Sequence, residues 1–585
     1  MKNRFLSYFM RRLGATALAI GLGTAAAVTI PASAVACGGF FCSNLPIDQT
    51  GEDILFATEE GKVRAYIRIF YQGEAKDFAW VVPVASKPTV SVGTATVFTR
   101  VDQVTRPIFN LEWDWGSGCF YPPMAAAEGD FDNTDGGGGG KSVTVVDTGQ
   151  VGPYDYAVVE SNDAALLTAW LNENDFDQPP EAEPLIAHYV ENDMMFVALK
   201  LQQDKGVGDI APLVLDFNEN NPCVPLILTR IAATPDMPVR VYVLSDQRAI
   251  PTNWLHVEIN EKKIDWLSGG GNYEQVVTAA VDEAAGRAFV TEFAGSSEPM
   301  KSMLYTEGQY QLDQLKTITH AGQFIMALQG QFQASQELLN LMRKHVPLPE
   351  SLAAQGVTEQ QFYNFPDNYE AEYAKISFEP NMFVADLETV IVKPLKEAQE
   401  MFDKHPYLTR LFTTVSPDEM TRDPLFGYNN TLGDVSNVHT AKLVTECDGE
   451  TTTKVEIVLS NGETFVPDLT NWWYSPTGGD APEATDLSAE PAATKIELLG
   501  ETGPARALGT QEVEFIDRQL DILPPEQVEV TGIDPAGNPG TNLPGGTTSG
   551  DNEKKGGCSV GGAASMPFWL SLLAGLSVVV RRRRR

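Results

Sequence analysis

The end of the chain is the feature that most constrains its fold. Residues 561–580 carry no charged side chain, and five arginines, 581–585, follow directly. At about 1.5 Å of rise per residue, twenty helical residues span about 30 Å, the thickness of a bilayer core. Each arginine costs about 2.5–3.5 kcal/mol at the membrane centre, so the cluster is expected to stay cytoplasmic while the preceding chain lies outside. This pattern predicts a C-terminal transmembrane helix that acts as a stop-transfer anchor.

The first 36 residues predict a signal peptide. Four basic residues come first, an uncharged stretch at 13–30 follows, and the small residues Ala34-Val35-Ala36 end the segment. This order is typical of a Sec-type export signal that is cleaved after Ala34 or Ala36. Cys37 directly follows the second site, so a lipoprotein is an alternative, although the Leu usual three residues before a lipidated Cys is absent. The expected partner of this segment is the export machinery.

The body between these ends is acidic but able to fold. The chain has 42 Lys and Arg against 78 Asp and Glu, a formal net charge of -36, and 43% hydrophobic residues. The hydrophobic content is ordinary for a globular protein. Binding to nucleic acid needs a basic face, so the charge balance predicts no nucleic-acid partner. We interpret the acidic residues as a solvated exterior, with attraction of divalent cations as the alternative.

The expected fold class is α+β, with a β-rich N-terminal part of mostly antiparallel strands, a helical middle and a small β-containing C-terminal part. Gly, Pro, Asn and Thr dominate residues 531–557, which predicts a disordered, flexible stalk. The expected divisions are 1–36 signal peptide, 37–268 α/β domain with a strand-rich core, 269–430 mainly helical part, 431–530 small β part, 531–557 linker and 558–585 sorting or transmembrane segment with its Arg tail.

Hydrophobic periodicity predicts the individual elements. Apolar and polar residues alternate along 63–71, as in a strand with one wet face, whereas 78–84 is apolar on both faces. Pro83 favours an edge or a bulge for that second strand. Further strands are expected at 194–199, 213–217, 226–231 and 239–244, with helices at 163–172, capped by Ser161 or Asn162, and at 185–190.

The middle of the chain changes to a helical period. A helix is expected at 273–286, and apolar residues at 318–346 follow steps of three and four. That stripe could be a coiled coil, but Gly322 and Gly330 lie inside it, which favours a packed helix or a helical hairpin. Another helix is expected at 382–403. A β-hairpin is expected at 454–466, with its turn at Asn461-Gly462.

The chain has six cysteines, and most of them are candidates for disulfide bonds. Five would lie outside the cytoplasm as disulfide candidates, Cys37, Cys42, Cys119, Cys223 and Cys447. They allow at most two bridges, and the pairing cannot be selected from the sequence. We expect Cys37 and Cys42 to be oxidised, either to each other or to Cys119 and Cys223. No pair has the short C-x-x-C spacing, so metal ligation is the weaker interpretation.

The zinc-protease and phosphate-loop motifs are absent from the sequence. It has six histidines, no H-E-x-x-H and no phosphate-binding loop motif. We therefore predict no catalytic, cofactor-binding or metal-binding residues and no cofactor. The proximity of Asp434, Ser436 and His439 along the chain is a poor reason to propose a catalytic triad.

Two other clusters have bland interpretations that we favour. Asp130, Asp132 and Asp135 resemble a calcium loop in composition, but the required Gly is displaced, so a solvated loop is favoured. The aromatic clusters could stack on sugars if exposed, although core packing is the commoner fate of such residues. They comprise Trp113, Trp115, Phe120 and Tyr121, and separately Trp472, Trp473 and Tyr474.

The start of the body resembles a bacterial family. The segment Ala36-Cys37-Gly38-Gly39-Phe40-Phe41-Cys42, then Pro46, Asp48-Gln49 and 78–84, is similar to the exported family called domain of unknown function 2330. Supporting pieces are Trp170-Leu171, Tyr189-Val190, 196–200 and Thr291-Glu292-Phe293, so the resemblance covers roughly 37–343. It implies an exported or surface-held protein with a shared fold, and it implies no catalytic or ligand residues.

The C-terminal end has a second resemblance. Cys558 in its Gly-rich approach, the hydrophobic segment and the Arg cluster resemble the MYXO-CTERM sorting signal of myxobacterial surface proteins. That resemblance implies cleavage near Cys558 by an intramembrane sorting protease, myxosortase, lipid attachment at this Cys and display on the outer surface of the outer membrane. A plain transmembrane anchor is the alternative.

These features favour a tethered surface protein with a noncatalytic structural or adhesive role. The alternative is an exported hydrolase that acts on extracellular polymer with no short motif. The empty motif searches and the few histidines favour the first, although carboxylates can replace histidine as general bases. The extracellular ligand and the oligomeric state stay open.

Overall fold

The structure is a computed structural model that describes most of residues 48–528. The described residues are 48–59, 61–72, 78–115, 144–174, 176, 178–179, 181–202, 209–219, 221–448, 451–469, 483–523 and 525–528. The predicted signal peptide, stalk and sorting segment lie outside these residues. Among the helices that are described, none has the length and apolar character that a membrane span requires.

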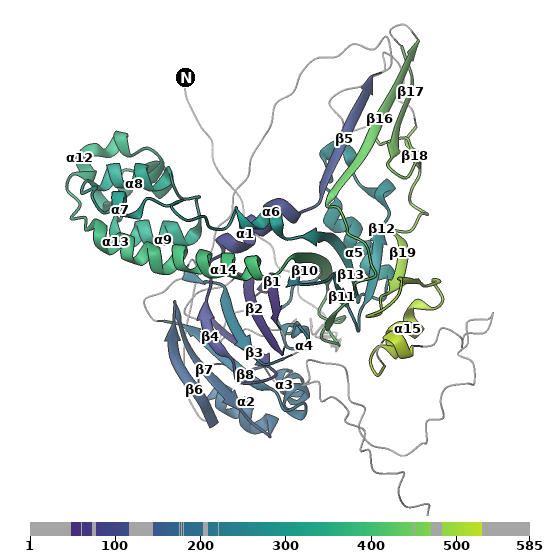
Figure 1. The fold of residues 1–585 in the computed structure, drawn as a ribbon, viewed down its shortest axis with the longest axis horizontal. Helices are drawn as coiled ribbons and strands as arrows, with labels where there is room; N and C mark the ends of the chain where they lie inside the picture. Colours follow the sequence, from purple (N-terminus) through teal and green to yellow (C-terminus); the bar gives the residue numbers. More distant parts are fainter. Residues whose placement is uncertain are drawn as a thin grey trace, which may run out of the picture. The chain divides into compact units, whose positions relative to one another are not determined.

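A ten-stranded mixed sheet organises the body (Figure 1). In spatial order its strands are β20 (Arg506–Ala507), β19 (Ala493–Leu498), β12 (Leu255–Ile259), β13 (Ala288–Ser296), β14 (Tyr407–Val415), β10 (Met237–Ser245), β1 (Asp48–Glu59), β2 (Lys62–Gln72), β9 (Leu213–Phe217) and β4 (Thr89–Val92). Only two neighbouring pairs, β1 with β10 and β12 with β13, are parallel. All three predicted parts of the body contribute strands to this one sheet.

A smaller sheet covers one face of the central sheet. Its strand order is β3 (Ala79–Val84), β8 (Met195–Leu201), β7 (Tyr154–Glu160) and β6 (Thr144–Val151). Buried valines of β10 share a core with Trp80 and Val82 of β3. The helices α2 (Ala164–Asn172), α3 (Ala182–Glu191) and α4 (Leu226–Thr229) pack on the outer side of this sheet. The result is a layered arrangement of two sheets and a helical cover (Figure 1).

Helices cover the opposite face of the central sheet. Leu55, Tyr66 and Tyr242 of that face belong to one core with the helices. The longer helices of this group are α1 (Thr96–Thr105), α8 (Ala321–Gln329), α9 (Gln336–His345), α13 (Pro380–Leu387) and α14 (Lys393–Lys404), and shorter ones are α6 (Glu298–Lys301), α7 (Leu312–Leu315), α10 (Glu350–Ala353), α11 (Glu359–Asn364) and α12 (Glu370–Tyr373).

The remaining elements are two small sheets, helix α5 and the helix near the C-terminal end of the described chain. A four-stranded sheet has the order β18 (Thr464–Phe465), β17 (Thr451–Leu459), β16 (Val438–Asp448) and β5 (Ile108–Trp115), and a two-stranded one joins β11 (Ala249–Pro251) to β15 (Phe426–Tyr428). The four-stranded sheet packs on Trp266 and on Val276 of α5 (Tyr273–Glu283). The last described helix is α15 (Val513–Gln519), which packs in the core beside β12 and β19.

Most elements with a strong period lie where the sequence predicts them. The 63–71 strand is β2, and the 78–84 strand is β3, an edge strand that tolerates Pro83. The stripe at 318–346 is a pair of helices, α8 and α9, with the side chain of Ser335 capping the second. The 382–403 helix is α13 and α14 joined through a π-helical turn, Glu388–Val392. The α+β class with mainly antiparallel sheets is confirmed.

Two local predictions are wrong. The expected strand at 226–231 is instead α4, because buried side chains accept its first amide protons: Ile227 donates to Asp423 at 2.8 Å. The N-cap of α2 is Asp163 rather than Ser161 or Asn162, since the Asp163 carboxylate accepts from the Leu166 amide at 3.0 Å. Ser161 contributes by accepting from the Asp163 amide at 3.2 Å.

Candidate binding groove

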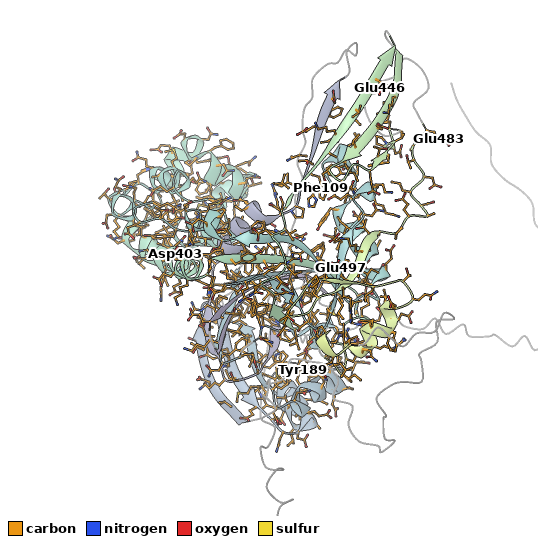
Figure 2. All side chains as sticks on the ribbon, turned by 45° about the vertical axis from the view of Figure 1, so that its right-hand side comes forward. Phe109, Tyr189, Asp403, Glu446, Glu483 and Glu497 are labelled. Carbon is orange, nitrogen blue, oxygen red and sulfur yellow. The ribbon has the colours of Figure 1, made fainter. Side chains whose placement is uncertain are left out.

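A groove of about 830 Å³ lies between α14 and the ends of β1, β2, β9 and β4, and we name it the β4–α14 groove. Its volume is within the range of small-ligand sites, about 300–1,000 Å³. Asp403, labelled in Figure 2, marks the end of α14. The charged lining side chains are five basic ones, Lys62, Arg64, Lys87, Lys393 and Lys404, and four acidic ones, Glu59, Asp216, Glu397 and Glu400.

The helical wall follows from the amphipathic sequence of α14. Lys393, Glu397, Glu400 and Lys404 recur at steps of four, three and four residues, so they lie along one side of the helix. The opposite side contains Leu395, Ala398 and Phe402, which are buried in the helix-covered core. Burial of that side presents the charged row to the groove.

The floor is a row of paired side chains across three strands. Asp216 of β9 lies directly opposite Arg64 of β2 on one side and Thr89 of β4 on the other. Arg64 donates to both carboxylate oxygens of Asp216, with distances of 2.6 and 3.0 Å. This bidentate hydrogen bond raises the pKa of Arg64. The floor is therefore held in a fixed geometry before any ligand arrives.

Ion pairs also order the rim. Lys404 contacts Glu59 at 2.7 Å, and Lys87 contacts Asp147 of β6 at 2.8 Å. The hydrogen bond from Lys404 lowers the pKa of Glu59. A general acid in glycoside hydrolysis needs the opposite, a carboxyl whose pKa is raised. Glu59 is thus suited to accept hydrogen bonds and is unsuited to donate a proton.

The three residues that lie close along the chain, Asp434, Ser436 and His439, have separate partners in the structure. The Nδ1 atom of His439 lies 2.7 Å from the Glu261 carboxylate, and the His439 ring stacks on Phe109. Asp434 instead contacts the Tyr407 hydroxyl at 2.7 Å, and the Ser436 hydroxyl accepts from the Val438 amide at 3.1 Å. This arrangement gives no reason to propose a triad here.

The other sequence candidates are mostly beyond what the structure describes. Trp113 is half-buried against the core beneath the four-stranded sheet. Cys223 is disulfide-bonded, and its pairing stays a prediction. The remaining candidates lie outside the residues or side chains that the structure describes: Cys37, Cys42, Cys119, Cys447, Cys558, Trp115, Phe120, Tyr121, Asp130, Asp132, Asp135, Trp472, Trp473 and Tyr474. Within the described residues, no group of three or more His, Cys, Asp and Glu side chains could hold a metal ion.

A buried network that the sequence did not reveal joins β12, β13 and β19. His256 lies 3.2 Å from Glu497 through Nδ1 and 3.0 Å from the Thr291 hydroxyl through Nε2. Arg248 donates to the same hydroxyl at 3.2 Å. Glu497 is labelled in Figure 2, where side chains crowd around it. The only sequence signal was the Thr291-Glu292-Phe293 segment of the family resemblance.

The carboxylate, imidazole and hydroxyl of this network are connected as in a catalytic triad, but they are buried like residues that stabilise a fold. His256 is 5% exposed and Thr291 is 7% exposed, and neither lines the β4–α14 groove. The hydrogen bond with His256 lowers the pKa of Glu497, as expected for a carboxylate that anchors a strand. The network links three neighbouring strands, so we assign it to the stability of the sheet.

A second buried carboxylate lies among residues of the family resemblance. Glu52 of β1 is 5% exposed and accepts a hydrogen bond from the Gln49 amide at 3.2 Å. It borders a cavity of about 10 Å³ together with Trp80 and Pro83. Burial raises the pKa of Glu52 to about 7. The ionised form is therefore the costly one in the folded protein.

Stability should depend on pH through Glu52. Between pH 4.5, the pKa of this carboxyl in the unfolded chain, and about pH 7, its pKa in the folded protein, only the folded protein keeps the proton. The stability that comes from this protonated carboxyl is therefore complete below pH 4.5 and is lost as the pH rises through 7. At pH 8 the ionised side chain costs about 3 kcal/mol. Glu52→Gln should thus be more stable than the wild type at pH 8 and equal to it at pH 4, measured by urea unfolding.

The exposed Glu183 of α3 is a matched control. Glu183→Gln should leave the difference from wild type the same at both pH values. If the gain in free energy of unfolding from Glu52→Gln does not increase between pH 4 and pH 8, the Glu52 carboxyl is not buried in its protonated form.

Comparison with known proteins identifies a family and little else. Neither a curated protein nor a solved structure matches this chain. A family model described as an uncharacterized protein conserved in bacteria (DUF2330) matches residues 31–356. This match includes the floor of the groove and Glu52, whereas α14 lies beyond it. Because the match spans more than half of the sequence, the chain belongs to the DUF2330 family.

Proposed function

We propose that this chain is a noncatalytic binding module, exported and tethered at the outer cell surface, and that the β4–α14 groove is its ligand site. One observation carries the proposal: a preformed groove of about 830 Å³ whose charged side chains are ordered by ion pairs along both the wall and the floor. A site that is ordered before binding loses less side-chain entropy when the ligand arrives. Such a groove suits an adhesive role.

The alternative of an exported hydrolase has less support. Hydrolysis requires a nucleophile beside a base, or two carboxyls in different protonation states. The described residues that line the groove include no histidine, and the pKa of Glu59 is lowered. The Thr291 hydroxyl next to His256 is buried away from the groove. These features favour binding without turnover.

Tethering rests on the two ends of the sequence. We propose export through residues 1–36 and attachment through 558–585, either as a membrane-spanning segment or by a lipid on Cys558 after cleavage by an intramembrane sorting protease. Replacing Cys558 by Ala should block the lipid route and leave a larger, uncleaved protein in the cell membrane fraction. Surface biotinylation and immunoblotting of fractions would measure this.

Ser559→Ala is the control for that variant, since it changes the neighbouring residue and keeps the thiol. It should reach the surface at the wild-type size. If Cys558→Ala also reaches the surface at the wild-type size, the sorting proposal is wrong and a plain transmembrane anchor takes its place.

The groove itself can be tested by charge reversal. The double variant Lys62→Glu, Lys393→Glu places like charges beside Glu59 and Glu397 and should lower retention of cell-surface polysaccharide from the producing culture by about tenfold, which corresponds to about 1.4 kcal/mol. The measurement is the amount of polysaccharide retained by the immobilised full chain.

The matched control reverses two exposed lysines of the helical group, Lys316→Glu and Lys375→Glu, which have the same net charge change. It should retain polysaccharide as the wild type does. Equal retention by the groove variant would contradict the proposed site. Release of new reducing ends from the retained polysaccharide would instead support a hydrolase.

A further inference from the structure

The charge balance of the β4–α14 groove differs from that of the chain. The whole sequence has 42 basic and 78 acidic residues, whereas the described residues that line the groove include five basic and four acidic ones. A ligand in this groove therefore meets almost no net charge, inside a protein whose overall charge is -36.

This balance disfavours both kinds of charged polymer. A polyanion would be repelled by the acidic protein as a whole and would gain only about one unit of net positive charge in the groove. A polycation would be attracted at long range, but it would have to pass five basic side chains. Either ligand would also compete with existing pairs such as Arg64 with Asp216 and Lys404 with Glu59.

The same side chains suit an uncharged ligand that is rich in hydroxyl groups. Carboxylates accept hydrogen bonds and ammonium or guanidinium groups donate them, so both sides of the groove can bond to hydroxyls. Within the described residues, the hydroxyls of Thr89 and Ser91 on β4 have no hydrogen-bond partner, and both residues line the groove. These hydroxyls are free to bind a ligand.

The groove is also long enough for several sugar units. The charged row of α14 runs from Lys393 to Lys404, a rise of about 16 Å for a helix. The floor below it crosses three neighbouring strands, which lie about 4.8 Å apart. Among the lining residues that the structure describes, Phe217 is the one aromatic residue, so the groove recognises its ligand mainly through hydrogen bonds.

We infer that the β4–α14 groove binds a neutral oligosaccharide segment of an extracellular polymer. This inference rests on the proposed function and adds the chemical class of the ligand. Hydroxyls of the sugar form hydrogen bonds with the charged side chains of α14 and β2 and with the hydroxyls of β4. No ion pair of the groove has to break when the sugar binds.

The test uses the full chain and isothermal titration with three neutral hexasaccharides, cellohexaose, laminarihexaose and maltohexaose. At least one should bind, with a dissociation constant that changes less than about twofold between 50 and 500 mM NaCl, because neutral binding releases no counterions. The variant Thr89→Val, Ser91→Ala keeps every charge and should weaken binding about tenfold. Ser302→Ala, Ser351→Ala should bind as the wild type does, since Ser302 follows α6, Ser351 lies in α10, and neither residue lines the groove.

Other outcomes overturn the inference in distinguishable ways. Binding of polygalacturonate or of chitosan hexamer that weakens steeply with salt, without binding of the neutral hexasaccharides, would replace a neutral ligand by a charged one and leave the proposed function intact. If neither neutral nor charged saccharides bind, or if both groove variants (Thr89→Val, Ser91→Ala and Lys62→Glu, Lys393→Glu) bind them as tightly as the wild type does, both the inference and the proposed groove are wrong.

Discussion

Replacing Asp517 by Ala is expected to lower the free energy of unfolding of the C-terminal part by about 3–5 kcal/mol. Asp517 of α15 is 1% exposed and pairs with two arginines, Arg287 and Arg422. Arg422 is fully buried, so removing the carboxylate leaves a buried guanidinium without its main counter-charge. The last described elements before the predicted stalk depend on this contact.

Urea unfolding and limited proteolysis would measure the effect. Asp517→Ala should release segment 483–528 at urea concentrations that leave the rest of the chain folded. Asp521→Ala is a matched control, because Asp521 pairs with the same Arg422 at 2.7 Å but its side chain is 47% exposed. It should cost no more than about 1 kcal/mol. Equal stability of the Asp517 and Asp521 variants would contradict the assignment of Asp517 as the buried counter-charge that holds α15 in place.

A chain that ends at residue 356, where the family match ends, should not fold. That chain lacks β14, which lies between β13 and β10 in the middle of the central sheet. Without β14, two strands lose their antiparallel partner, and the buried Leu408, Leu411 and Phe412 are missing from the core. Circular dichroism on heating should show no cooperative transition for this chain.

A chain that ends at Val528 keeps every described element and is the control. Its melting temperature should be within about 2 °C of that of the full chain, less than the shift expected from 1 kcal/mol in a domain of 150–250 residues. A cooperative transition of the shorter chain would show that the family region completes its own sheet. The extension after residue 356 would then be an addition to the fold and not a part of it.

Local elements could be predicted from the sequence because local periodicity determines them. The alternation at 63–71 and the apolar row of α14 each lie within one segment, and both are where the sequence places them. The strand order could not be predicted, since β14 pairs with two strands, β10 and β13, that each lie more than 100 residues before it in the chain. The wrong strand at 226–231 has the same cause: Asp423, far along the chain, accepts the amide proton of Ile227 and stabilises a helix.

The groove was invisible in the sequence for a similar reason. Its lining comes from segments between residues 57 and 404, and no short motif contains more than a few of them. The family resemblance pointed elsewhere, and most of its residues that the structure describes are buried. At Thr291-Glu292-Phe293 the register of β13 shifts, so that Thr291 contacts His256 while Glu292 pairs with the buried Arg410. These residues hold the sheet together and do not report the ligand.

The most direct test of the β4–α14 groove is hydrogen–deuterium exchange of the full chain with and without the hexasaccharide that binds best. Slower exchange is expected in segments 57–64, 87–92, 214–218 and 393–404, which together form the floor and wall of the groove. Unchanged exchange in these four segments, with protection elsewhere in the chain or nowhere, would contradict the account.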